Sequence, residues 1–88
     1  MTFKIERAHS GQVTTIRLIG RLGPECLGEL KEQVERGGPQ VILDLTEAEL
    51  VDVEVVRFLN ACQNTGAEIA NCPPYIRGWM RRERKPGP

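Results

Sequence analysis

The 88-residue sequence lacks the long apolar runs and leader-like segments that mark membrane and exported proteins. No stretch approaches the ~20 consecutive apolar residues that a transmembrane helix needs. The opening residues, MTFKIER, place a charge every few positions and contain no apolar core of the kind found in signal peptides. We therefore expect a cytoplasmic protein that inserts no segment into a membrane.

Cysteine and histidine are also scarce, and their spacing matches no usual metal site. The cysteines, Cys26, Cys62 and Cys72, are odd in number, lie far apart and form no CxxC pair. Together with the one histidine, His9, they show none of the spacings typical of zinc ligands. We expect free thiols in a reducing compartment, and neither a metal nor another cofactor.

Candidates for catalysis are few. The segment GRLGPE has neither the lysine nor the length of a phosphate-binding loop. His9 falls in an expected turn, where a single histidine is more often a surface residue than a general base. Cys26 falls in the first turn of an expected helix, where the helix dipole could lower the pKa of its thiol, but no base is near it in the sequence. We expect no enzyme, and an enzyme using Cys26 or Cys72 is an alternative.

Charge is balanced in total and uneven along the chain. Residues 1–76 hold 7 basic and 11 acidic residues, a net of −4, whereas residues 77–88 hold 5 and 1, a net of +4. The segment 44–54 contains acids and no basic residue: Asp44, Glu47, Glu49, Asp52 and Glu54. Such a patch suits a basic protein surface, although a solvated loop gives the same pattern. Nucleic-acid binding by the basic 77–88 segment is a weaker alternative, because few aromatic residues interrupt its charges.

Apolar periodicity predicts a single domain over residues 1–83, followed by a disordered tail at 84–88. With 40% hydrophobic and 27% charged residues, the composition is that of an ordinary globular protein. Strand-like alternation covers residues 2–7 and 12–20, and a turn at 9–11 joins these strands as a hairpin. Glycines near residue 20 are expected to end the second strand.

A first helix is expected from Pro24 to the stop at Gly37-Gly38, with Glu32 and Arg36 as an ion pair one turn apart. Gly28 inside it suggests a close approach of another segment. Residues 40–45, QVILDL, then predict a central strand that is parallel to its neighbours and buried on both faces.

After a loop over residues 46–50, TEAEL, a second helix is expected in the segment 53–66, where Gly66 closes it. Its apolar face comprises Val55, Phe58, Leu59 and Cys62, and its polar face comprises Arg57, Asn60, Gln63 and Asn64. A strand at 67–72 and a helix at 74–84 follow, and we expect Tyr75 and Trp79 of that helix to cover the sheet. The order β-β-α-β-α-β-α indicates a small α/β domain with a mixed, mostly parallel sheet and an antiparallel strand at one edge.

Two acids stand where the second helix begins. Asp52 is a strong N-cap residue, because its side chain can accept a hydrogen bond from a backbone N–H two or three positions on. Glu54 gains from the helix dipole and, between Val53 and Val55, must point toward solvent. This helix follows the carboxyl end of a parallel strand, which is where open α/β sheets place their binding sites. A purely structural role for both acids explains the same pattern.

The pattern resembles the STAS family, the anti-anti-sigma-factor-like domains of bacteria. The segments that carry the resemblance are 16-IRLIGRL-22, 41-VILDLTEAELVD-52 and 66-GAEIANC-72. The resemblance implies a non-catalytic protein-interaction module of bacterial regulation. In such proteins an Asp-Ser-Ser-Gly-type segment opens the second helix, and a kinase-like anti-sigma factor phosphorylates its second hydroxyl residue, which breaks the complex.

The sequence departs from the family where that switch would be. Asp52 matches the family's aspartate, but Val53, Glu54 and Val55 stand at the positions of the serine, the phosphoacceptor and the glycine. A glutamate carries one negative charge and a phosphoserine about −1.5 to −2, so any mimicry is partial. The resemblance therefore implies a module that is not controlled by serine phosphorylation at the usual position. Thr46 is the nearest alternative phosphoacceptor.

We expect the partner to contact residues around the N-terminal ends of the first two helices: Arg21, Glu25, Glu49, Asp52, Val53, Glu54 and Arg57. A kinase-like anti-sigma factor is the first candidate partner. The alternative is that the chain is an accessory STAS-like subunit of a transport ATPase complex, docked on an ATPase subunit.

Overall fold

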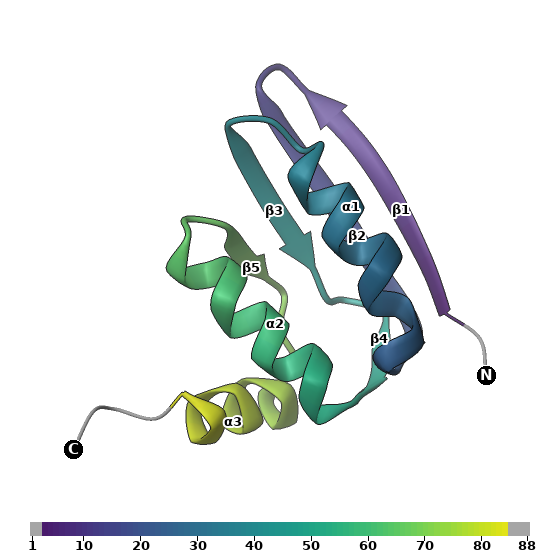
Figure 1. Cartoon of the computed structure of the whole chain (residues 1–88), viewed down its shortest axis with the longest axis vertical. Coiled ribbons are helices and arrows are strands. Elements are labelled where there is room, and N and C mark those ends of the chain that lie inside the picture. Colours follow the sequence, from purple (N-terminus) through teal and green to yellow (C-terminus); the bar gives the residue numbers. More distant parts are fainter. Residues whose placement is uncertain (1–2, 85–88) are drawn as a thin grey trace.

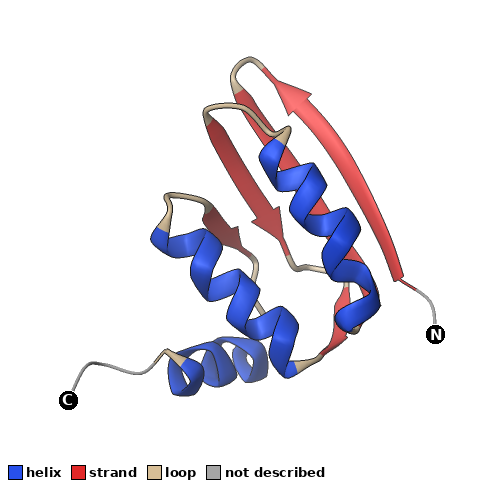
Figure 2. Ribbon diagram, viewed as in Figure 1, coloured by secondary structure: helices blue, strands red, loops and turns tan. Residues whose placement is uncertain are grey.

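The computed structural model describes residues 3–84, in which two helices lie over one face of a mixed sheet. Helices α1 (Leu27–Glu35) and α2 (Val53–Asn64) both lie over the sheet, and α3 (Pro74–Glu83) packs beside α2 (Figure 1). The ribbon coloured by element shows the same division into a strand layer and a helix layer (Figure 2). The ends of the predicted domain and tail, residues 1–2 and 85–88, lie outside the described residues.

Strands β1 (Phe3–Ser10) and β2 (Val13–Leu22) form the predicted antiparallel hairpin, and both are longer than expected. The turn predicted at residues 9–11 was placed too early. His9 and Ser10 belong to β1, opposite Thr14 and Val13, and the chain reverses at Gly11, which has a φ of +63°. A two-residue hairpin loop favours glycine at such a φ.

Gly20 was expected to end β2, but the strand continues through it. Its φ is +87°, and the register with the neighbouring strand shifts between Gly20 and Arg21. The extra residue lies in β4, where Glu49 falls between the partners of Gly20 and Arg21, and the pairing then continues to Leu22.

The first helical segment begins with a short 3-10 turn at Pro24–Cys26 and continues as α1. The ion pair between Arg36 and Glu32 is confirmed, with 3.5 Å between Nη2 and Oε2. The close approach predicted at Gly28 is wrong, since a Cβ there would meet nothing within 4 Å. The close approach occurs at Gly37, where a Cβ would lie 2.4 Å from Cγ2 of Val41.

Strand β3 (Gln40–Asp44) is central and parallel, as predicted, with β2 on one side and β5 (Glu68–Ala70) on the other. Val41 and Leu43 are buried, whereas Ile42 and Asp44 are only half-buried. The prediction that this strand is buried on both faces is therefore wrong for the face that carries Ile42 and Asp44, because the described helices cover mainly the other face.

An additional strand, β4 (Ala48–Val51), lies where a loop was expected. It runs parallel to the last three residues of β2 and pairs Arg21 with Leu50 and Leu22 with Val51. The side chain of Asp44 shapes the turn that leads into β4, since Oδ1 accepts hydrogen bonds from the backbone N–H and the hydroxyl of Thr46, at 2.9 and 2.6 Å. The observed order therefore contains one strand more than predicted.

The packing of α3 differs from the prediction in two respects. Asn60, expected on the polar face of α2, is buried, and its side-chain amide donates a hydrogen bond of 2.9 Å to the carbonyl oxygen of Met80. Trp79 is half-buried against the core, but Tyr75 is 49% exposed and does not cover the sheet. Tyr75 instead donates its hydroxyl proton to the carbonyl oxygen of Glu49, which ties α3 to β4.

The core lies between the sheet and the two helices above it. Most of its fully buried members come from β2, β3, α1 and α2, among them Ile16, Leu18, Leu30, Leu43, Val55 and Leu59, and α3 adds Ile76. All three cysteines are free and buried, as expected of thiols that form no disulfides. Of the helices between Phe3 and Arg84, none has the length and apolarity needed to cross a membrane.

Candidate functional site

The two segments that lead into the helices are joined by a backbone hydrogen bond. The N–H of Asp52 donates to the carbonyl oxygen of Leu22 at 3.0 Å, directly after the parallel pairing of β2 with β4 ends. Because both strands run in the same direction, their carboxyl ends meet at one edge of the sheet. This is the edge where open α/β sheets place binding sites.

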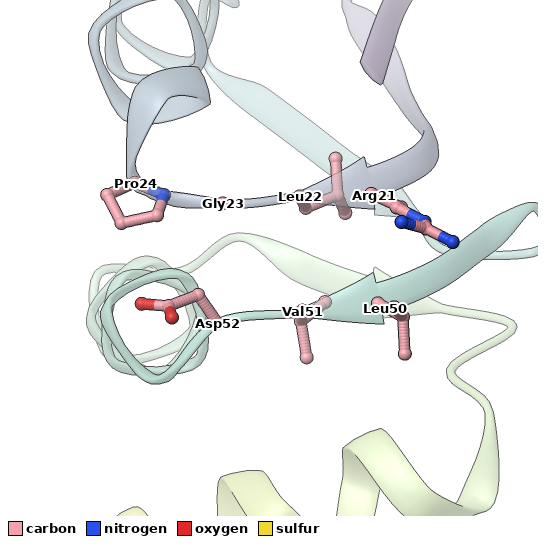
Figure 3. Close-up of a pocket in the computed structure, with 7 residues that line it drawn as sticks. All are labelled: Arg21, Leu22, Gly23, Pro24, Leu50, Val51 and Asp52. Atoms are coloured by element: carbon pink, nitrogen blue, oxygen red, sulfur yellow. The ribbon is translucent and has the colours of Figure 1, made fainter. Parts of the chain in front are cut away.

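A groove of about 240 Å³ lies along this junction (Figure 3). Its walls are mostly apolar and are formed from both segments: Leu22, Gly23, Pro24, Leu50 and Val51. Arg21 on one segment and Asp52 on the other lie at opposite ends of the groove and supply charges of opposite sign. Leu50 is 53% exposed, and its apolar side chain lies beside the apolar wall of the groove.

Asp52 caps α2, as predicted. Its Oδ2 accepts a hydrogen bond of 3.1 Å from the backbone N–H of Glu54, and its backbone has the extended conformation of an N-cap residue, with φ −91° and ψ 161°. The cap fixes the direction in which the first turn of α2 leaves the groove. Asp52 therefore has a structural role in addition to any contact with a partner.

Glu54 and Arg57 lie on α2 outside the groove. Glu54 is exposed, as expected, and its Oε2 lies 3.8 Å from Nη1 of Arg57. Arg57 also pairs with Glu83 of α3, with 3.1 Å between Nε and Oε1. The guanidinium of Arg57 is thus held toward α3, and it forms no part of the lining around Leu50.

The remaining predicted contact residues surround the groove without lining it. Val53 is half-buried in the first turn of α2. Glu25 is exposed and folds back over Gly23, where a Cβ would lie 2.6 Å from Oε1 of Glu25. Glu49 is exposed and lines a neighbouring hollow with Arg21. The structure therefore brings Arg21 and Asp52 to one groove and leaves the other predicted residues around it.

Arg17 of β2 forms ion pairs with the first two acids of the segment 44–54 and not with the others. The guanidinium of Arg17 lies 4.0 Å from the carboxylate of Asp44 and 3.7 Å from that of Glu47. It also lies 3.7 Å from Glu6, which is outside the segment. Burial alone would raise the pKa of Asp44, but hydrogen bonds from Thr46 and Asn71 and the charge of Arg17 outweigh it and lower that pKa. The acids near the groove, Glu49, Asp52 and Glu54, form no ion pair with Arg17.

The cysteines do not have the character of activated nucleophiles. Burial, reinforced by the charge of Glu25, raises the pKa of the Cys26 thiol to about 11, so the lowered pKa expected from the helix dipole is wrong. Burial raises the pKa of Cys62 to about 11 as well, and it raises that of Cys72. Within residues 3–84, no cluster of three histidine, cysteine or acidic side chains could hold a metal ion.

Sequence reasoning missed the apolar part of this site. Leu50 lies in a segment that was expected to be a loop, and the role of Pro24 was assigned only to helix initiation. The signal for Leu50 was weak, because AELV alternates too little to predict a strand with one exposed apolar side chain.

Comparison with known proteins connects this geometry to a fold. No protein-family model matches the chain, and no curated protein is similar to it in sequence. Among solved structures, it is similar to the anti-sigma factor antagonist SpoIIAA in its unphosphorylated form, with a TM-score of 0.64 and 14% identity. The similarity covers 91% of this chain and 82% of that one. The predicted fold class is therefore confirmed: the chain is a small α/β domain with a mixed sheet of five strands, and it has the STAS fold.

Proposed function

We propose that the chain is a non-catalytic protein-interaction module of bacterial regulation that acts in the cytoplasm. The observation that carries this proposal is the groove at the junction of β2, β4 and α2, where Leu50 is 53% exposed beside charged residues. An apolar centre with a polar rim is the usual anatomy of a protein–protein interface. The fold it shares with an anti-sigma factor antagonist supports the same class of function.

The partner surface is proposed to be basic with an apolar pocket. Leu50 would enter the pocket, and the exposed acids around the groove, Glu25, Glu49 and Glu54, would face basic side chains of the partner. Arg21 and Asp52 would fix the orientation at the two ends of the groove, while Val53 and Arg57 would extend the contact along α2. Complementary charge at the rim of an interface mainly raises the rate of association and excludes wrong partners.

A kinase-like anti-sigma factor is the proposed partner, and the interaction is proposed to be independent of phosphorylation at the start of α2. Val53, Glu54 and Val55 provide no hydroxyl there. Glu54 supplies a permanent single charge in place of a regulated one. Thr46 is exposed, and its hydroxyl donates to Asp44 at 2.6 Å, so an added phosphate would lie beside a carboxylate of the same charge.

The alternative is an accessory subunit of a transport ATPase complex. The same absence of a hydroxyl favours this alternative, because a partner without kinase activity would require none. Both functions would use the same groove and differ in the partner that occupies it.

A pull-down from native lysate with ATP or ADP, followed by mass spectrometry, tests the proposal. Wild-type protein is compared with Leu50→Asp, which places a charge in the apolar contact. Glu35→Lys is the matched control, because Glu35 is exposed at the far end of α1. Loss of a partner with Leu50→Asp and its retention with Glu35→Lys support the site. Retention of every partner by Leu50→Asp excludes it.

A further inference from the structure

A second hollow, of about 330 Å³, lies between α3, β5 and the C-terminal part of α2. Arg77, Arg81 and Arg84 line it together with the amide of Gln63. Ile69, Met80 and Cys72 complete the wall, and Cys72 and Met80 belong to the buried core. Unlike the groove beside Leu50, this hollow is lined mainly by polar atoms.

Within residues 3–84, the arginines of this hollow have no acidic partner. Arg77 and Arg81 are four residues apart and Arg84 follows three later, so their side chains leave neighbouring turns on one side of α3. Between Phe3 and Arg84, no carboxylate lies within 4.0 Å of these three guanidinium groups, whereas Arg17, Arg36 and Arg57 each form ion pairs. Among the described residues, these arginines contact α2 through a neutral group, with 3.5 Å between Nη2 of Arg84 and Oε1 of Gln63.

The helix dipole explains only part of this arrangement. Cations near a helix C-terminus are stabilised, which accounts for basic residues in the last turn of α3. Arg77, however, is the fourth residue of α3, nearer the end at which the dipole disfavours a cation. Cys72 supplies no counter-charge, because burial raises the pKa of its thiol. Like charges gathered around one hollow without a counter-charge indicate a place for an anion.

We propose that this hollow binds the phosphate group of a small phosphorylated molecule. Guanidinium groups present paired N–H donors that match phosphate oxygens, and the amide of Gln63 supplies a further donor. The hollow is larger than a single phosphate, so Ile69 and Met80 would contact the organic part of the ligand. Single-stranded nucleic acid is a poorer fit, because base stacking needs exposed aromatic rings and Trp79 is half-buried.

This site is separate from the protein-binding groove. Gln63 lies ten residues along α2 from Val53, a rise of about 15 Å at the usual helical pitch. None of the residues that line the groove also lines the hollow. The inference is therefore independent of the proposed protein partner.

Titration of the full chain with inorganic phosphate and with phenyl phosphate, at constant ionic strength and followed by NMR, tests the proposal. Saturable shifts in α3 and β5 are expected, with tighter binding of phenyl phosphate because of its apolar ring. Arg77→Gln and Arg81→Gln should each weaken binding by about tenfold, since each removes a charge-assisted contact. Arg82→Gln is the matched control: it removes the same charge from the same helix, but Arg82 does not line the hollow.

Three results would overturn the proposal. Equal weakening by Arg82→Gln would indicate general attraction of anions to a basic helix. Absence of saturable binding by the wild type, or binding of a single-stranded oligonucleotide without binding of either phosphate probe, would exclude a phosphate site. Circular dichroism of each variant shows whether α3 remains folded, and the conclusion uses only variants with the wild-type spectrum.

Discussion

Leu22 and Asp52 are joined by a backbone hydrogen bond of 3.0 Å, although they are far apart in the sequence. This bond continues the pairing of β2 with β4 by one residue and holds the Gly23-Pro24 segment against the first turn of α2. The groove beside Leu50 is therefore built from backbone that is already fixed in the free protein. A preformed binding surface loses less conformational entropy when a partner binds.

The cap at Asp52 leads to a first prediction. Asp52→Ala should lower the free energy of unfolding by about 1 kcal/mol, because the N–H of Glu54 loses its acceptor. Urea denaturation of wild type and variant measures this loss. Asp52→Asn is the control, since asparagine caps as well as aspartate and removes only the charge. If both variants lose the same stability, the charge and not the cap stabilises α2.

The local features of this fold were predictable from the sequence. The hairpin, the central strand and the cap at Asp52 depend on neighbours within a few residues, such as the N–H of Glu54. Local periodicity and capping chemistry determine such features, so one sequence is sufficient to predict them.

Features that depend on distant segments were not predictable. Strand β4 exists because it pairs with Gly20, Arg21 and Leu22 at the end of β2, and nothing in AELV indicates that pairing. Asn60 was assigned to the exposed face because its partner, the carbonyl oxygen of Met80, belongs to α3. Leu50 was missed as a site residue for the same reason, since its place beside the groove follows from β4.

Two glycines of the first helical region should respond oppositely to the same change. Gly37→Ala should cost about 1–3 kcal/mol, because its Cβ would lie 2.4 Å from Val41 and 3.1 Å from the carbonyl oxygen of Val34. Gly28→Ala should stabilise the protein by about 0.5–1 kcal/mol, since its Cβ meets nothing within 4 Å and alanine favours the helix. Thermal unfolding of both variants measures the difference, and destabilisation by Gly28→Ala would contradict the open environment of that residue.

Asn60 should hold α3 against α2. Asn60→Ala removes a buried hydrogen bond to the carbonyl oxygen of Met80, which keeps its bond from the N–H of Arg84, and should cost about 0.5–1.5 kcal/mol. Hydrogen exchange should show the loss first in the amides of α3. Asn64→Ala is the control, because Asn64 is exposed at the end of the same helix and its replacement should change stability by less than about 0.5 kcal/mol. Unchanged exchange in α3 with Asn60→Ala would show that apolar packing alone positions this helix.

The buried thiols predict a loss of stability at alkaline pH. The pKa of Cys26 and that of Cys62 rise from 9.0 to about 11 on folding, so the folded state favours the neutral thiols. Their contribution to stability is fully present below pH 9 and is lost as the pH rises from 9 toward 11. Unfolding free energies measured across this range should fall more steeply for the wild type than for the double variant Cys26→Ala, Cys62→Ala. Parallel curves would show that other groups cause the alkaline loss.

Glu54 provides a test of whether the position keeps the geometry of a switch. Glu54→Ser places a hydroxyl in the first turn of α2, where the helix dipole would stabilise an added phosphate and leave the fold intact. If the partner is a kinase, Glu54→Ser should gain one phosphate in ATP and then release the partner, while it stays bound in ADP. Wild type should bind equally with either nucleotide. Glu54→Gln removes the charge without adding a hydroxyl and serves as the control, so a nucleotide-dependent release by Glu54→Gln would show that the nucleotide acts through the partner and not through a phosphate on residue 54. Intact-protein mass spectrometry of the bound and released fractions distinguishes these results.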